Sequence, residues 1–93
     1  MTLEQLLRLV EKKPLVWRPR VCSDSRNVRQ GDIFVAVKGS KMDGHNFIGQ
    51  AAVSGARYIV AQQPVQVASA EVIQTDDTTR ALGLLSQAYY NYP

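Results

Sequence analysis

The sequence places two hydroxyls, a carboxylate and a guanidinium in four consecutive residues, Ser23-Asp24-Ser25-Arg26. Serine hydroxyls and backbone amides can donate to phosphate oxygens, and a hydrogen bond to a charged group contributes about 1.5–3 kcal/mol. Asp24 is unsuited to contact a phosphate because two anions repel, so it is expected to cap a turn or to pair with Arg26 and hold the serines in place. The residues alone leave two interpretations open: a phosphate-binding cluster, or an Asx-type turn without a ligand.

Two other side chains could take part in chemistry, His45 and Cys22. His45 stands in a glycine-containing loop, where a histidine that bonds its own backbone is the simpler interpretation. Cys22 is the single cysteine, which excludes an internal disulfide, and with one histidine it cannot form a recognisable structural zinc site. We therefore expect Cys22 to be a buried structural residue and not a nucleophile.

The glycine loops do not match a nucleotide-binding motif. A P-loop requires a lysine and a hydroxyl residue directly after its second glycine, whereas Gly44 is followed by His45 and Asn46. The sequence also lacks the G-x-G-x-x-G fingerprint of dinucleotide-binding domains. These 93 residues therefore contain no visible machinery for ATP.

The elements that must position the polar cluster follow an α/β pattern. A capping box at Thr2–Gln5 starts a helix that Pro14 ends, and a final helix begins at Asp77 or Thr78. A further short helix and several apolar runs lie between them. The expected strands are 21–22, 33–37, 58–61 and 71–75, with a weaker extended piece at 65–67 and a helix over 47–55.

Length and composition suit one small layered α/β domain, with a mixed β-sheet flanked by helices. The chain has 93 residues, of which 45% are hydrophobic and 20% charged. A net charge of +3 is far from the clustered basic stripe typical of nucleic-acid binding. No apolar stretch approaches the roughly 20 residues that span a bilayer, and the N-terminus lacks a signal-peptide layout. We therefore expect a cytoplasmic protein with no membrane span and no nucleic-acid partner.

Four motifs follow one another between Asp24 and Ala61: D-S-R, G-D-I-F-V-A-x-x-G, D-G-H-x-F-I and A-x-x-x-G-A. In this order and spacing they resemble the N-terminal domain of the Mur ligases, with the MurE type, the UDP-N-acetylmuramoyl-tripeptide synthetases, as the nearest branch. The resemblance covers most of the chain from about Val21 onward and continues weakly to its end. It implies a bacterial enzyme of peptidoglycan biosynthesis.

The resemblance also implies a division of labour between three domains. The first holds the UDP end of UDP-MurNAc-L-Ala-D-Glu, the second binds ATP and Mg²⁺, and the third brings a diamino acid, diaminopimelate or lysine. ATP phosphorylates the substrate carboxylate, and an amine attacks the acyl phosphate. Residues 1–93 would be the first domain, which contacts the ATP-binding domain of its own parent chain and is inactive alone.

Site residues follow from the resemblance position by position. Ser25 matches the serine that contacts the diphosphate, and Ser23 matches a residue of the uridine pocket, where a backbone contact is expected. The loop after Gly39 matches the one that wraps uracil and ribose, with glycine shaping the turn that follows. The expected substrate contacts are Ser23, Ser25, Ser40, Lys41 and Met42, and the expected supporting residues are Asp24, Arg26, Asp43, Gly44 and His45.

Three alternatives remain open. The first is the same domain from the sister ligase that adds D-alanyl-D-alanine (MurF type). The second is a free-standing interaction module that uses the aromatic tail, Tyr89 to Pro93, as its contact surface. The third and weakest is single-stranded nucleic-acid binding through basic and aromatic residues.

Overall fold

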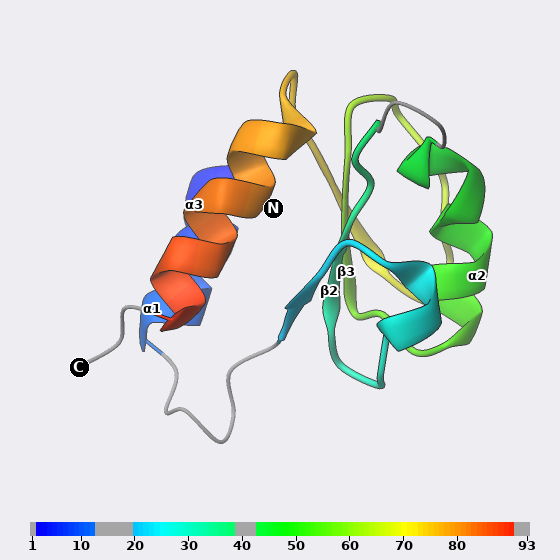
Figure 1. Ribbon diagram of the computed structural model, residues 1–93, viewed down its shortest axis with the longest axis horizontal. Helices are drawn as coiled ribbons and strands as arrows, with labels where there is room; N and C mark the ends of the chain where they lie inside the picture. The colour runs from blue at the N-terminus through cyan, green and yellow to red at the C-terminus, as the bar shows by residue number, and fades with distance from the viewer. Residues whose placement is uncertain (1, 13–19, 39–42, 91–93) are drawn as a thin grey trace.

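The computed structural model describes residues 2–12, 20–38 and 43–90, which form a parallel sheet between two layers of helices and turns (Figure 1). The α/β fold class is confirmed. In chain order the elements are α1 (Leu3–Lys12), β1 (Val21–Cys22), η2 (Ser25–Asn27), β2 (Ile33–Val35), η3 (Gly44–Phe47), α2 (Ile48–Val53), β3 (Tyr58–Ala61), β4 (Glu71–Gln74) and α3 (Thr78–Tyr90), where η marks a 3₁₀ helix.

The sheet is wound in one direction, with its described strands in the order β1-β2-β3-β4 and every neighbouring pair parallel. The expectation of a mixed sheet is therefore wrong. Residues 62–70 carry the chain from the end of β3 back to the starting edge without a helix, so that β4 runs parallel to β3. The extended piece expected at 65–67 is not a strand; Val65 and Val67 instead pack, half-buried, under this link.

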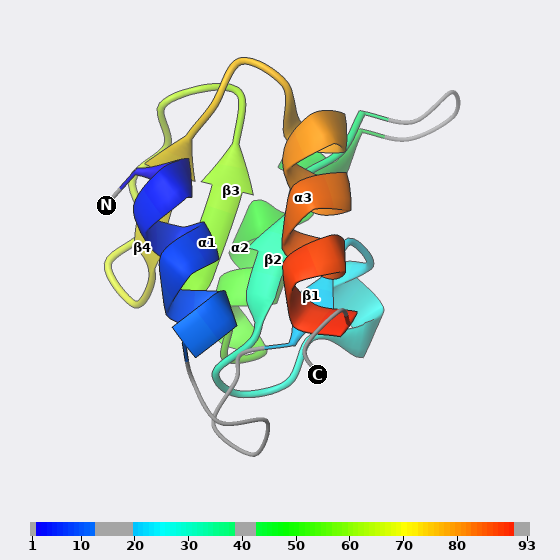
Figure 2. The same cartoon turned by 90° about the vertical axis from the view of Figure 1, so that its left-hand side faces the viewer.

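A one-way parallel sheet explains the two layers. Crossovers between parallel strands are almost always right-handed, so strands added in one direction place their connections on the same face. That face is covered by η2, α2 and the 62–70 link, and the opposite face is left for α1 and α3 (Figure 1). The two outer helices lie side by side across it (Figure 2).

Side chains of the central strands alternate between two cores, as a period of two requires. Ile33 and Val35 of β2 point to α1 and α3, whereas Phe34 points to α2. On the neighbouring strand Val60 joins the first core and Ile59 the second. All five are fully buried, which confirms the prediction of a strand covered on both faces.

The helix ends confirm the predicted caps. Thr2 Oγ1 accepts from Gln5 N at 3.2 Å while Gln5 Oε1 accepts from Thr2 N at 2.8 Å, which is a complete capping box. At the start of α3, Asp77 Oδ1 accepts from Arg80 N at 3.0 Å.

Tyr89, near the end of α3, packs against the first core, so this ring of the aromatic tail has a partner within the chain. Within the described residues, no helix has the length and apolarity needed to cross a bilayer.

Candidate functional site

Asp24 organises the polar cluster at the carboxyl end of β1. Its Oδ1 accepts from Arg26 N at 2.9 Å, which caps η2, and Arg26 Nε and an Nη atom donate to the two carboxylate oxygens at 3.1 and 2.9 Å. The side-chain and backbone hydrogen bonds from Arg26 hold the pKa of Asp24 below its ordinary value. The predicted roles of Asp24, turn cap and partner of Arg26, are both confirmed.

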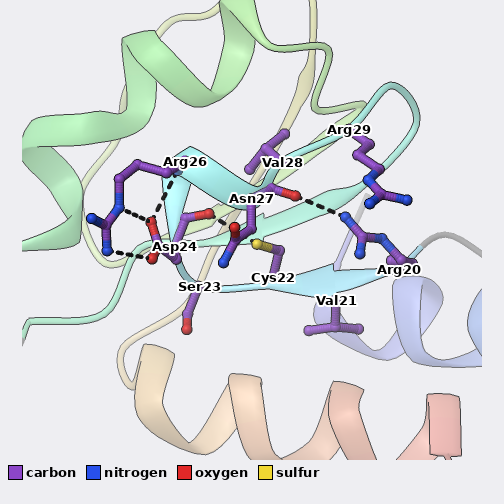
Figure 3. A pocket seen from close by; sticks show the side chains of 9 residues that line it. All are labelled: Arg20, Val21, Cys22, Ser23, Asp24, Arg26, Asn27, Val28 and Arg29. Atoms are coloured by element: carbon purple, nitrogen blue, oxygen red, sulfur yellow. Dashed lines mark hydrogen bonds and ion pairs between the residues drawn. The ribbon is translucent and has the colours of Figure 1, made fainter.

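The two serines of the cluster face different cavities. Ser25 is buried, with 6% of its surface exposed, and lines a cavity of about 440 Å³ that we call the Ser25 cavity. Ser23 is exposed and lines a second cavity of about 460 Å³, the arginine cavity. Figure 3 shows the Ser23 side chain pointing away from the guanidinium of Arg26. Asp24 and Arg26 line both cavities and so form the wall between them.

The Ser25 cavity combines a polar side with an apolar one. Ser25 Oγ donates to Gln50 Oε1 of α2 at 3.4 Å, while Val37 and Phe47 supply apolar lining. It lies where β1 and β2 end, the edge at which parallel α/β sheets usually bind ligands. The lining residues are Asp24, Ser25, Arg26, Val37, Gly44, Phe47 and Gln50.

Gly44 is required by close packing at the rim of this cavity. A Cβ there would lie 2.8 Å from Val37 N and 2.9 Å from Val37 O, both of them backbone atoms. Gly44 N also donates to Val37 O at 2.8 Å. The structure thus gives Gly44 a packing role, while a role in shaping the turn stays a prediction.

Several side chains that line the arginine cavity are already bonded to other groups of the chain (Figure 3). Arg20 donates to Asn27 O at 2.8 Å and pairs with buried Asp32 at 2.7 Å, and the hydrogen bond and charge of Asp32 raise the pKa of Arg20. Cys22 Sγ donates to Asp24 O at 3.0 Å. The thiol is half-buried and not fully buried as expected, because β1 is at the edge of the sheet.

The ring of His45 connects the start of η3 to the end of β3 through two hydrogen bonds. Asp43 Oδ1 accepts from His45 N at 3.0 Å and lies 2.7 Å from His45 Nδ1, and the hydrogen bonds from His45 lower the pKa of Asp43. On the other side of the ring, Nε2 accepts from Gln62 N at 3.0 Å, beyond the end of β3. Gln62 in turn accepts from the buried hydroxyl of Thr78 at the start of α3. The interpretation of His45 as a loop residue that bonds its own backbone is therefore wrong for the ring, which bonds the carboxylate of Asp43 and the distant backbone amide of Gln62.

Three expected contacts, Ser40, Lys41 and Met42, lie outside the described residues. The segments that flank them meet in an antiparallel bridge between Lys38 and Asp43. In the described part of the chain, no group of three or more His, Cys, Asp or Glu side chains could hold a metal ion. Three residues that line the Ser25 cavity, Val37, Phe47 and Gln50, were missed by sequence reasoning. Phe47 stands inside the D-G-H-x-F-I motif, whereas nothing in the sequence singles out Gln50.

The comparisons of this chain with known proteins agree on one family. The family model described as "Mur ligase family, catalytic domain" matches residues 20–90. The UDP-N-acetylmuramoyl-L-alanyl-D-glutamate–2,6-diaminopimelate ligase of Clostridium perfringens is 44% identical over 71 residues, 75% of this chain and 15% of that protein. The ligase of the same name from Bacillus cereus is 37% identical and is matched over all of this chain and 20% of its own length.

Solved structures of a sister ligase share the fold. The MurF ligase from Thermotoga maritima, in complex with ADP, superposes with a TM-score of 0.65 at 38% identity over 78% of this chain and 17% of that chain. MurF from Acinetobacter baumannii gives a TM-score of 0.70 at 28% identity, over 95% of this chain and 20% of that chain. This chain therefore spans at most about one fifth of these proteins.

Proposed function

The chain belongs to the Mur ligase family, and from this membership we propose that it is the N-terminal domain that binds the UDP end of UDP-MurNAc-L-Ala-D-Glu in a MurE-type ligase. The parent enzyme would join an amino acid to the peptidoglycan precursor in the bacterial cytoplasm. Because the curated relatives quoted above are named diaminopimelate ligases, we infer that diaminopimelate is the amino acid added.

The observation that carries the proposal is the buried hydroxyl of Ser25 in a cavity at the carboxyl ends of β1 and β2. The cavity volume, about 440 Å³, falls within the range usual for small-molecule sites. Ser25 and the largely exposed guanidinium of Arg26 provide donors for a diphosphate, and Phe47 and Val37 provide apolar surface. Asp24 holds Arg26 at the cavity wall and partly offsets its charge.

The ligation itself needs groups outside these 93 residues. ATP and Mg²⁺ would be held by a further domain, because this sequence lacks a P-loop. Within this reading the role of the chain is to bind and orient one end of the substrate, so the isolated chain is expected to bind without turnover. Ser40, Lys41 and Met42 remain proposed contacts to uracil and ribose.

A MurF-type parent is the second candidate, favoured by the 38% identity to the Thermotoga maritima enzyme. The two types differ in the peptide at the far end of the substrate and share its UDP end. Assaying the parent enzyme with diaminopimelate and with D-alanyl-D-alanine separates them, and the MurE reading expects incorporation of diaminopimelate only. The interaction-module alternative loses support because Tyr89 packs against the core of the chain.

An NMR titration of the chain with UDP-MurNAc-L-Ala-D-Glu tests the proposal. Shifts are expected at 23–26, Gly44, Phe47 and Gln50, and Ser25→Ala should weaken binding about tenfold or more, as the loss of a bond to a charged group does. Ser54→Ala is the matched control, because Ser54 lines a cavity formed by other segments and should leave the affinity unchanged. Absence of shifts at millimolar ligand, or shifts confined to residues around Ser54, would refute the proposal.

A further inference from the structure

The hydroxyl that is expected to meet the diphosphate already has a partner. Ser25 Oγ donates to Gln50 Oε1, and the two residues are 25 positions apart in the sequence. A serine hydroxyl has one proton, so while it points at Gln50 it cannot be donated to a phosphate oxygen. Binding of a diphosphate at Ser25 therefore requires this hydrogen bond to change.

The side-chain amide of Gln50 can make that change without losing its contact with Ser25. Oxygen and nitrogen of a glutamine amide exchange places when the group turns over, so Nε2 can donate to Ser25 Oγ instead. The serine proton is then free to point into the cavity. The existing hydrogen bond is long, at 3.4 Å, and Gln50 lies on the exposed face of α2. Rotation of its amide group therefore disrupts little packing.

The other polar groups of the cavity cannot take over this task. The ionised carboxylate of Asp24, which is paired with Arg26, can accept a hydrogen bond but has no proton to donate to Ser25 Oγ in the complex. The guanidinium of Arg26 can donate but has no acceptor for the serine proton. Val37, Gly44 and Phe47 offer no side-chain hydrogen-bonding group. Among the described lining residues, Gln50 alone can accept from Ser25 in the free chain and donate to it in the complex.

We propose that Gln50 is a positioning residue that directs the hydroxyl of Ser25 toward a phosphate oxygen of a bound nucleoside diphosphate. The inference rests on the proposed function. It adds to it a residue that was not among the contacts expected from the four motifs. Gln50 acts through Ser25 and does not itself contact the phosphate. Its replacement should therefore matter for ligands with phosphates and only when Ser25 is present.

A double-mutant cycle measured with UDP and with uridine tests this directly. The variants are Gln50→Met, Ser25→Ala and the double substitution, with affinities from NMR titration of the whole chain. Gln50→Met should weaken UDP about three- to tenfold and uridine less than twofold, and it should have no further effect in the Ser25→Ala background. Gln87→Met is the matched control, because Gln87 is an exposed helix residue on α3, away from this cavity.

The outcomes separate the two proposals. No UDP binding by the wild-type chain would overturn the proposed function and this inference with it. Wild-type binding that Gln50→Met leaves unchanged would overturn this inference alone. Additive effects in the double variant would mean that Gln50 acts independently of Ser25, and equal losses for UDP and uridine would mean a structural role; either result would also refute it.

Discussion

The backbone amide of Gln62 donates to Nε2 of His45 across 3.0 Å, and this bond fixes the tautomer of the imidazole. Because Nε2 accepts, the proton of a neutral ring is on Nδ1, which donates to Asp43 Oδ1 at 2.7 Å. One side chain thereby joins the turn at residues 43–47 to the end of β3. Gln62 continues the connection to α3 through Thr78.

The tautomer is directly measurable. We expect ¹⁵N NMR at neutral pH to show a protonated Nδ1 and an unprotonated Nε2 for His45. Replacing His45 by Leu removes both ring hydrogen bonds and should lower the free energy of unfolding by about 1–2 kcal/mol, since a typical net hydrogen bond contributes about 1 kcal/mol. Asn46→Ala, an exposed neighbour, should change little. A protonated Nε2 in the folded chain would contradict the assignment.

Acid should weaken the fold through Asp24 and Asp43. Hydrogen bonds from Arg26 and from His45 lower the pKa of these two carboxyls, so the folded state binds their protons less readily than the unfolded state does. Their stabilising contribution is complete above the unfolded pKa, about 3.9, and is lost as the pH falls through the lower folded value. Urea unfolding between pH 2 and 7 should show this fall below about pH 4.

The matched variant for the pH experiment replaces both carboxyls, Asp24→Asn with Asp43→Asn. It should be less stable than the wild type at pH 6, and its stability should depend less on pH in the acid range. A variant that retains the full acid sensitivity of the wild type would show that these two groups do not cause it.

Asp32 should be far more important for stability than Asp24. Asp32 is buried and accepts from Arg20 at 2.7 Å and from Arg29 N at 2.8 Å, so Asp32→Ala leaves donors unpaired beside β2. We expect a loss of about 2 kcal/mol or more in the free energy of unfolding, measured by urea titration. Asp24→Ala breaks an exposed pair and should cost less. Equal losses would contradict this ranking.

Two glycines should respond to alanine in opposite directions. Gly55 has φ +109°, and a Cβ there would lie 2.8 Å from Gln30 Cα, so Gly55→Ala strains the backbone and creates a clash. Gly83 lies within α3 with open space around it, and Gly83→Ala should stabilise by about 1 kcal/mol through helix propensity. Thermal unfolding of both variants checks the signs. A stabilised Gly55→Ala would refute the close contact.

Local features of the site were predictable from the sequence, because their causes lie within a few residues. Asp24 caps and pairs with Arg26 two positions away, and Thr2 and Gln5 cap each other over three. The same holds for the apolar runs that became β2 and β3. Their side-chain alternation follows from strand geometry once both faces are covered.

Features that depend on the assembled fold were not predictable in the same way. Gln50 meets Ser25 only because α2 packs beside η2, and Gln62 meets His45 only because β3 ends next to η3. That every strand pair is parallel was not evident either, because a link of ordinary loop composition serves as the crossover between β3 and β4. That Ser23 and Ser25 line two different cavities likewise depends on the folded structure and could not be predicted from the sequence.

The contact between α1 and α3 has a consequence for how the chain can fold during its synthesis. Leu6 and Val10 precede Leu85, with which they share a core, by at least 75 positions in the sequence. Contacts between residues so far apart in the sequence, together with parallel strand pairing, raise the contact order and slow folding. Until α3 emerges from the ribosome, α1 alone can cover this face of the nascent sheet, and this period is when chaperone binding or aggregation would compete with folding.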